Sequence, residues 1–164
     1  TVERGSVSET EIQTEIDIAA LPSIVWAVLT DFSGFREWNP MVTSAEGPAT
    51  EGSLATLHYR SNVGVPLRFE VEITRADRDR ELRWIGSRLG ISGEHYFELM
   101  PHEGGTRFVH GEVFRGLLAG PLGFVFRNQV PVFEAFNRAL KEVAERRVQN
   151  ASVAPTGGTA PARP

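Results

Sequence analysis

The sequence predicts an α+β fold in which a β-sheet wraps around one long C-terminal helix. Between residues 117 and 147, apolar residues recur every three or four positions, which is the period of one helical face. Before that segment, apolar and polar residues alternate in several short runs, as in half-buried strands. With 164 residues and 41% hydrophobic content, the chain can form one domain with a sizeable core.

The long helix is predicted over Phe124–Arg147, a stretch with one proline and no glycine. At a rise of ~1.5 Å per residue it would extend roughly 35–40 Å, enough to cross a small domain. Pro131 lacks a backbone donor, so we expect the helix to bend there. The residues expected on its inward face are Val125, Gln129, Val132, Phe133, Phe136, Leu140 and Val143.

The first part of the chain predicts one strand followed by two short helices. Residues 1–10 are polar and are expected to be frayed. Isoleucine and threonine alternate with polar residues over Ile12–Ile18, which indicates a half-buried strand. Pro22 suits the first turn of a helix, so short helices are expected at Pro22–Thr30 and Phe35–Trp38.

Six further strands are predicted before the long helix. Their alternation is clearest where Leu67, Phe69, Val71 and Ile73 are separated by charged residues. The predicted strands are Val42–Glu46, Leu54–Arg60, Leu67–Thr74, Leu82–Arg88, Ser92–Met100 and Thr106–Phe114, with a hairpin loop at Pro101–Gly105. Residues 148–164 contain few bulky apolar side chains and are expected to form a disordered tail.

Composition excludes several classes of function. The formal charge is −4 and the basic residues are scattered, which argues against a nucleic-acid partner. Without cysteine, the chain has no disulfide, thiol nucleophile or thiolate metal site. No apolar run approaches the ~20 residues that a membrane-spanning helix needs, so we expect no stable membrane insertion and a cytoplasmic location. The sequence does not specify an oligomeric state.

Two histidines and one glutamate form the most informative polar group. His95 and His110 each lie in the apolar phase of a predicted strand, and Glu112 shares that phase. Pairing around the hairpin loop would place His95 opposite or diagonal to both other residues. Three interpretations remain open: a polar cluster that fixes the hairpin, an anchor for a ligand hydroxyl or carbonyl, and an acid–base pair.

Other catalytic and metal-binding patterns are absent from the sequence. No helix carries histidines four residues apart, so we expect no metal site. No Gly-x-Ser-x-Gly motif or phosphate-binding glycine loop is present, and no cofactor is expected. His102 is expected to be solvated beside the hairpin loop, whereas the strand phase of His58 is ambiguous.

Several segments resemble the START-related SRPBCC superfamily, which includes polyketide cyclase/dehydrase-like and birch-allergen-like domains. The opening segments are Val25–Phe32 and Phe35–Pro40, and later segments similar to small bacterial members are Glu81–Trp84, Gly93–Leu99, Gly105–Glu112 and Phe114–Leu118. The resemblance covers residues 11–147. It implies a helix-grip fold: a curved seven-stranded antiparallel sheet closing on the long helix, with two short helices after the first strand and a cavity between sheet and helix.

The leading hypothesis is binding or carriage of a small hydrophobic molecule, such as a lipid, polyketide or aromatic metabolite, in that cavity. Gly86 and Gly93 lie near large aromatic residues and are expected to leave interior volume unfilled. The candidate ligand-binding residues are Trp38, Phe69, Trp84, His95, Phe97, His110, Glu112, Phe126 and Phe133.

Two alternatives remain open beside ligand binding. The first is a polyketide cyclase/dehydratase-like enzyme in which His95 or His110 acts as acid–base and Glu112 orients it. The second is a protein-interaction module of the chaperone-activator kind, which the fold would permit. The sequence does not identify the ligand, because an apolar cavity selects by shape.

Overall fold

The computed structural model describes residues 8–60, 67–88, 90–116, 119 and 128–153. The elements in chain order are β1 (Ser8–Ile18), α1 (Pro22–Leu29), a 3-10 turn η1 (Phe32–Gly34), α2 (Phe35–Trp38), β2 (Val42–Glu46), β3 (Leu54–Tyr59), β4 (Leu67–Asp77), β5 (Glu81–Arg88), β6 (Ile91–His102), β7 (Gly105–Gly116) and α4 (Val130–Val153). The predicted succession of one strand, two short helices, six strands and a long helix is confirmed.

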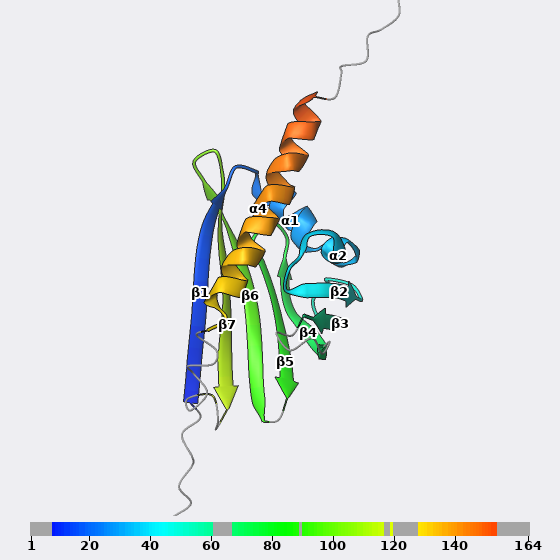
Figure 1. The fold of residues 1–164 in the computed structure, drawn as a ribbon, viewed down its shortest axis with the longest axis vertical. Helices are drawn as coiled ribbons and strands as arrows, with labels where there is room; N and C mark the ends of the chain where they lie inside the picture. The colour runs from blue at the N-terminus through cyan, green and yellow to red at the C-terminus, as the bar shows by residue number, and fades with distance from the viewer. Residues whose placement is uncertain (1–7, 61–66, 89, 117–118, 120–127, 154–164) are drawn as a thin grey trace, which may run out of the picture.

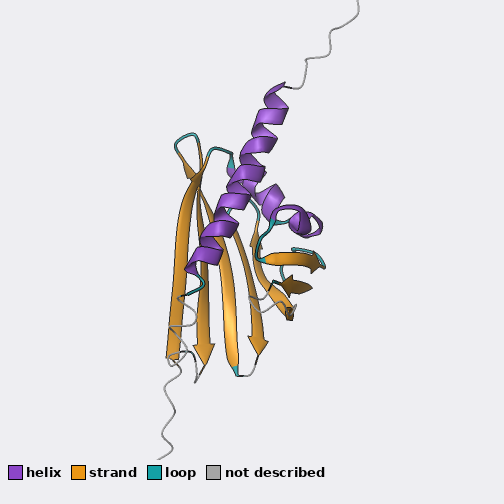
Figure 2. Ribbon diagram, viewed as in Figure 1, coloured by secondary structure: helices purple, strands orange, loops and turns teal. Residues whose placement is uncertain are grey.

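One antiparallel sheet contains all seven of these strands, in the order β1-β7-β6-β5-β4-β3-β2. Consecutive strands pair as neighbours from β2 to β7, and the first strand completes the sheet by pairing with the last. Helix α4 lies across one face of the sheet, with α1 and α2 beside it (Figures 1 and 2). The lower ends of β5, β6 and β7 extend past the first turn of α4 (Figure 1).

Strand alternation determines which side chains face the helix. In β4, Val71 and Ile73 are buried whereas Glu70 and Glu72 are exposed, as the period of two requires. The residue row of β6 that faces α4 contains His95, Phe97 and Leu99, all buried. Strand β6 therefore presents a mainly apolar inward row that includes one histidine.

The opposite face of the sheet contains a smaller cluster of Tyr96, Val109 and Val113. The Tyr96 hydroxyl donates to Glu11 at 2.7 Å, and the Arg83 guanidinium lies 5.0 Å from its ring centroid. A Cβ on the cross-strand partner Gly111 would come within 2.2 Å of the Tyr96 ring. Glycine at position 111 therefore lets the tyrosine lie flat across the strand.

Helix α4 supplies the other half of the core. Its buried residues Phe133, Phe136, Leu140 and Ala144 follow the three- and four-residue spacing of one helical face. Phe136 packs against Phe97 and Phe108 of the sheet, with ring centroids 5.7 and 6.5 Å away. The predicted apolar face is thus confirmed for the described part of the helix.

The boundaries of α4 differ from the predicted ones. The helix begins at Val130 after a turn in which the Gln129 carbonyl accepts from the backbone N–H groups of Val132 and Phe133. Pro131 therefore lies in the first helical turn, where a missing N–H costs nothing, so the predicted bend is wrong. Of the predicted earlier part, residues 124–127 lie outside the described residues.

The far end of α4 was also predicted wrongly. The helix continues past Arg147 to Val153, so residues 148–153 are helical rather than part of a disordered tail. The half-buried Val148 packs against the core and extends the apolar face by one position. Burial of this valine favours the extra turns that composition alone did not predict. Residues 154–164 lie outside the described residues.

Polar contacts attach the second half of α4 to the end of β1. The Glu145 carboxylate accepts from the backbone N–H of Ala19 at 2.8 Å and pairs with Lys141 at 3.1 Å. The Lys141 ammonium in turn donates to the backbone carbonyl of Asp17 at 2.6 Å. These contacts join α4 to the segment at the end of β1.

Candidate functional site

The polar residues singled out in the sequence lie side by side on the inner face of the sheet. Trp84 of β5 pairs with His95 of β6, which in turn pairs with Glu112 of β7. His110 lies on β7 opposite Phe97. The His95 and His110 rings are 5.6 Å apart, so the predicted contact between these residues is confirmed.

His95 and Glu112 form a close pair with little access to solvent. The His95 Nδ1 atom lies 3.2 Å from Glu112 Oε1, and the side chains are 6% and 14% exposed, respectively. A carboxylate this protected needs a polar partner, because burying an unpaired charge is costly. The cross-strand register supplies that partner directly.

Gly93 makes room for the carboxylate. A Cβ at this position would lie 2.4 Å from Glu112 Oε1, so any larger residue would push the carboxylate away from His95. The expectation that Gly93 leaves empty volume is therefore wrong, because Glu112 occupies the space. Gly86, its partner across the strands, would place a Cβ 3.2 Å from Val71.

His110 is held by a chain of hydrogen bonds to α4 and β1. Its Nδ1 lies 3.0 Å from Asn137 Oδ1, and Asn137 Nδ2 donates to Thr14 Oγ1 at 2.9 Å. The Thr14 hydroxyl donates to the His110 backbone carbonyl at 3.2 Å. Burial holds the pKa of His110 well below its usual value, the neighbouring His95 lowers it further, and the Asn137 bond opposes both.

Sequence reasoning did not identify Asn137 or Thr14 as part of the site. The available signals were positional: Asn137 is four residues after Phe133 on the helix, and Thr14 lies in the same strand phase as Ile12 and Ile16. A polar residue on an expected apolar face indicates a buried partner. The partner itself could not be inferred without the docking of α4 on β1.

Aromatic rings from the sheet and the helix enclose the two histidines. The His110 ring stacks on Phe133 of α4 at 4.1 Å, with Phe97 at 4.7 Å and Phe136 at 4.8 Å. The His95 ring lies 5.3 Å from Phe133. Phe97 and Phe133, both predicted site residues, are therefore in contact with the polar cluster, which faces the helix as expected.

Three buried nitrogen atoms in this region have no hydrogen-bond partner among the described residues. They are Trp84 Nε1, His95 Nε2 and His110 Nε2. Buried polar atoms in folded proteins are nearly always paired, and each unpaired one costs about 1–3 kcal/mol. Because the three belong to neighbouring strands on one face, they form a set of polar atoms that a bound molecule could satisfy.

Tyr59 approaches the same region from β3. Although the residue as a whole is only partly buried, burial of its hydroxyl raises the phenol pKa far above the usual value, and the Glu112 charge adds to that rise. The Trp84 indole opposes the rise, although its Nε1 makes no hydrogen bond of normal geometry. Sequence reasoning missed this residue because only the curvature of the sheet brings β3 toward β7.

Beyond Tyr59, the inner face continues with partly exposed apolar side chains. Phe69, a predicted site residue, packs edge-on against Tyr59 at 5.4 Å. The Arg88 guanidinium lies 5.7 Å from the Phe69 ring centroid at the end of β5. Ile91 is half-buried at the adjacent start of β6. This end of the sheet thus combines aromatic surface with one cation.

The other sequence-based candidates lie elsewhere or cannot be placed. Trp38 packs between Phe35 and Phe136, each at 5.3 Å, and makes no contact with the histidine pair. Phe126 lies outside the described residues. His58 is in the outward phase of β3, because Leu57 is fully buried. His102 is exposed and lies 3.8 Å from Asp17, as expected for a solvated residue.

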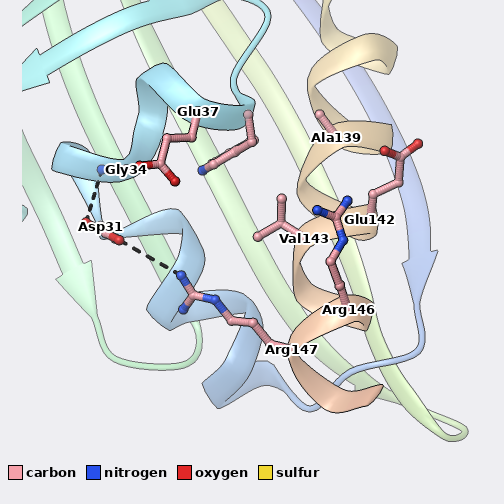
Figure 3. Close-up of a pocket in the computed structure, with 9 residues that line it drawn as sticks. Asp31, Gly34, Glu37, Ala139, Glu142, Val143, Arg146 and Arg147 are labelled. Atoms are coloured by element: carbon pink, nitrogen blue, oxygen red, sulfur yellow. Dashed lines mark hydrogen bonds and ion pairs between the residues drawn. The ribbon is translucent and has the colours of Figure 1, made fainter. Parts of the chain in front are cut away.

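Two surface hollows over the described residues lie away from the histidine pair. One, of about 390 Å³, lies between the α2 region and the second half of α4 (Figure 3). Its lining includes Trp38, Val143 and the ion pair of Arg147 with Asp31 at 3.9 Å. The other, of about 290 Å³, lies beside β1 and α4.

Within the described ranges, no set of three or more histidine, aspartate or glutamate side chains is arranged to hold a metal ion. No helix in these ranges is both long and apolar enough to cross a bilayer.

An antiparallel seven-stranded sheet that closes on one long C-terminal helix defines the helix-grip class of proteins. Residues 9–148 match the family described as polyketide cyclase / dehydrase and lipid transport. The chain therefore belongs to this family, and the resemblance to polyketide cyclase-like SRPBCC domains is confirmed.

Solved structures with the same fold include named cyclases. The Zhui aromatase/cyclase from Streptomyces sp. R1128 has a TM-score of 0.72 at 19% identity, covering 93% of this chain and 100% of its own. Protein SA2116 from Staphylococcus aureus, of unknown function, has a TM-score of 0.71 at 15% identity, covering 88% of this chain and 98% of its own.

A two-domain protein is also similar. BexL, a di-domain aromatase/cyclase from the BE-7585A biosynthetic pathway, has a TM-score of 0.65 at 14% identity, covering 84% of this chain and 49% of its own. At these identities the similarity shows the fold alone. No match was found among curated proteins.

Proposed function

We propose that this protein binds a small hydrophobic molecule, such as a polyketide, lipid or aromatic metabolite, on the inner face of its sheet. The polar end of the molecule would contact the row formed by Trp84, His95 and His110. Its apolar part would lie against Tyr59 and Phe69, where the inner face is only partly buried.

The observation that carries this proposal is the set of three unpaired buried nitrogens on adjacent strands. A purely structural polar cluster would be expected to satisfy its own members, as the Asn137 amide satisfies His110 Nδ1. Family membership supports the proposal, since the family description includes lipid transport and polyketide chemistry. The named cyclases of the same fold are consistent with a ligand of that class.

The test is saturable binding of an aromatic probe, measured by calorimetry and by intrinsic tryptophan fluorescence. We expect 2-naphthol to bind with a stoichiometry near one. Trp84→Phe removes an unpaired donor and should weaken binding, whereas Arg146→Ala, which alters the distant hollow of Figure 3, should not. Absence of saturable binding, or loss of binding only in Arg146→Ala, would reject the inner-face site.

A second candidate function is acid–base catalysis on a polyketide-like substrate. The specific observation in its favour is the 3.2 Å contact of His95 Nδ1 with the Glu112 carboxylate, which leaves His95 Nε2 unpaired. A carboxylate that orients an imidazole in this way leaves the other nitrogen available to exchange a proton.

Native mass spectrometry of protein purified from its own host would show whether the protein retains a bound molecule.

A further inference from the structure

We propose that the hydrogen-bond chain Thr14–Asn137–His110 fixes the His110 imidazole as an acceptor at Nε2, so the site selects hydrophobic molecules with a hydroxyl donor. This inference rests on the proposed ligand-binding function and names the ligand class more closely: phenols and alcohols rather than hydrocarbons of the same shape. In it, Thr14 and Asn137 are positioning residues that act through His110.

The direction of each hydrogen bond follows from the one before it. The Thr14 hydroxyl has a single hydrogen, which it donates to the His110 backbone carbonyl at 3.2 Å. Its oxygen can therefore only accept from Asn137, at 2.9 Å, so the Asn137 amide directs its NH2 group to β1. The amide oxygen then faces His110 Nδ1 at 3.0 Å and must accept a hydrogen from it.

A neutral imidazole has one ring hydrogen, so a hydrogen on Nδ1 leaves Nε2 with a free lone pair. The surroundings favour the neutral form, because burial and the nearby His95 both lower the pKa of His110. His110 is fully buried, and its Nε2 has no partner among the described residues. The rings of Phe97, Phe133 and Phe136 around it contribute no conventional donor.

The neighbouring groups complete the pattern of donors and acceptors. Trp84 Nε1 can only donate, and it is also unpaired. His95 directs Nδ1 at Glu112, 3.2 Å away. The row thus offers a donor on β5 and an acceptor on β7, which suits a hydroxyl that gives its hydrogen to His110 or a molecule with separate donor and acceptor groups.

The first experiment determines the histidine tautomer without any ligand. Long-range proton–nitrogen correlation NMR on isotope-labelled histidine should show His110 with its hydrogen on Nδ1 and a bare Nε2. Thr14→Ser retains the hydroxyl and should keep that tautomer. Thr14→Val has nearly the same shape but frees the Asn137 amide to turn, so the Nε2–H tautomer should appear. A wild-type Nε2–H tautomer would overturn the proposal, whether or not the variants fold.

The second experiment compares two probes that differ by a hydroxyl in place of a methyl group, 2-naphthol and 2-methylnaphthalene. One hydrogen bond to a buried acceptor should make 2-naphthol bind wild type about 2- to 12-fold more tightly. Thr14→Ser should retain this preference. In Thr14→Val the ratio of the two dissociation constants should fall toward one.

The outcomes separate this inference from the function on which it rests. If neither probe binds wild type, the proposed binding function fails. If both bind with equal affinity, or if Thr14→Val keeps the full preference for 2-naphthol, ligand binding stands and the role assigned to the Thr14–Asn137–His110 chain is wrong.

Discussion

In the His95–Glu112 pair, ligand binding and catalysis require different properties of Glu112. A binding site needs the carboxylate to hold the imidazole in place, whereas an acid–base site also needs its charge. Glutamine has nearly the same shape as glutamate but no charge, so Glu112→Gln removes the charge beside His95 and buries no new one.

Glu112→Gln should therefore distinguish the two functions. A binding protein should lose about 1–2 kcal/mol of affinity for a ligand anchored at the pair, since one charge-assisted contact is weakened. An enzyme should instead lose turnover by about 10²- to 10⁴-fold with ligand affinity largely intact. Glu98→Gln, on the outer side of the same hairpin, is the control and should change neither quantity. A variant with unaltered affinity and turnover would show that Glu112 has only a structural role.

Gly93→Ala tests the same pair without altering either member. The new Cβ would lie 2.4 Å from Glu112 Oε1, so the carboxylate must move away from His95. We expect ligand affinity to fall about as much as in Glu112→Gln, measured by calorimetry. Gly86→Ala adds the same methyl group on the paired strand, 3.2 Å from Val71, and should have a smaller effect. Equal effects of the two substitutions would show that general crowding, rather than displacement of Glu112, causes the loss.

The buried His110 should make stability depend on pH. Its pKa is lowered in the folded state, so between that value and the unfolded value of about 6.5 only the unfolded chain binds the proton. The contribution of His110 to the free energy of unfolding is therefore fully present above about pH 6.5. It decreases as pH falls, by up to ~1.4 kcal/mol per pH unit. Urea unfolding of wild type from about pH 7.5 to about pH 5.5 should show this decline.

The control for that measurement is a pair of histidine variants. His110→Phe should reduce the pH dependence, and His102→Gln, at an exposed site, should retain it. The comparison is needed because the His95 ring lies 5.6 Å from the His110 ring and pairs with Glu112, and this pair is unchanged in all three proteins. Identical slopes in wild type and His110→Phe would contradict the assignment of the dependence to His110.

At the scale of elements, α4 closes the structure, because its buried face covers the inner surface of the sheet. Phe136 lies at the centre of this contact, fully buried among Trp38, Phe97, Phe108 and His110.

Phe136→Ala should lower the free energy of unfolding by ~3–5 kcal/mol, through lost transfer energy and the cavity that remains. This is a large fraction of the roughly 5–15 kcal/mol that stabilises a typical domain. Arg138→Ala, on the exposed side of the same helix, should change it by less than about 0.5 kcal/mol. Chemical denaturation of both variants measures the difference, and similar midpoints would mean that Phe136 is not central to the core.

For the whole molecule, the length of α4 decides how much of the C-terminal segment contributes to stability. A chain ending at Val153 should unfold at the same denaturant concentration as the full chain. A chain ending at Arg147 loses Val148, which is half-buried against the core, and should be less stable by about 1 kcal/mol. Equal midpoints for the two truncated chains would show that the last turns of α4 add nothing to the core.

Most of the fold could be predicted from the sequence because its signals are local. Each strand alternates apolar and polar residues as its own geometry requires, so all seven strands were predicted, with errors at their ends. The largest error is in β1, which begins at Ser8 rather than Ile12, so the prediction that residues 8–10 are frayed is wrong; these residues pair with β7. The same alternation placed His95, His110 and Glu112 on one face, and a short hairpin loop determined their register. For this reason, residue positions alone predicted the contact among these three side chains.

The tertiary structure decided the features that depend on contacts between distant segments. Asn137 lies in the site because α4 docks beside β1, and Tyr59 lies near it because the sheet curves. Packing also set both ends of α4. Local helix propensity predicts a start before Val130, and it gives no indication that the helix continues past Arg147 to Val153. The sequence by itself thus determined which residues of each helix and strand face the core. The docking of these elements determined which polar atoms remain unpaired, because the energy of docking comes from burial and long-range hydrogen bonds.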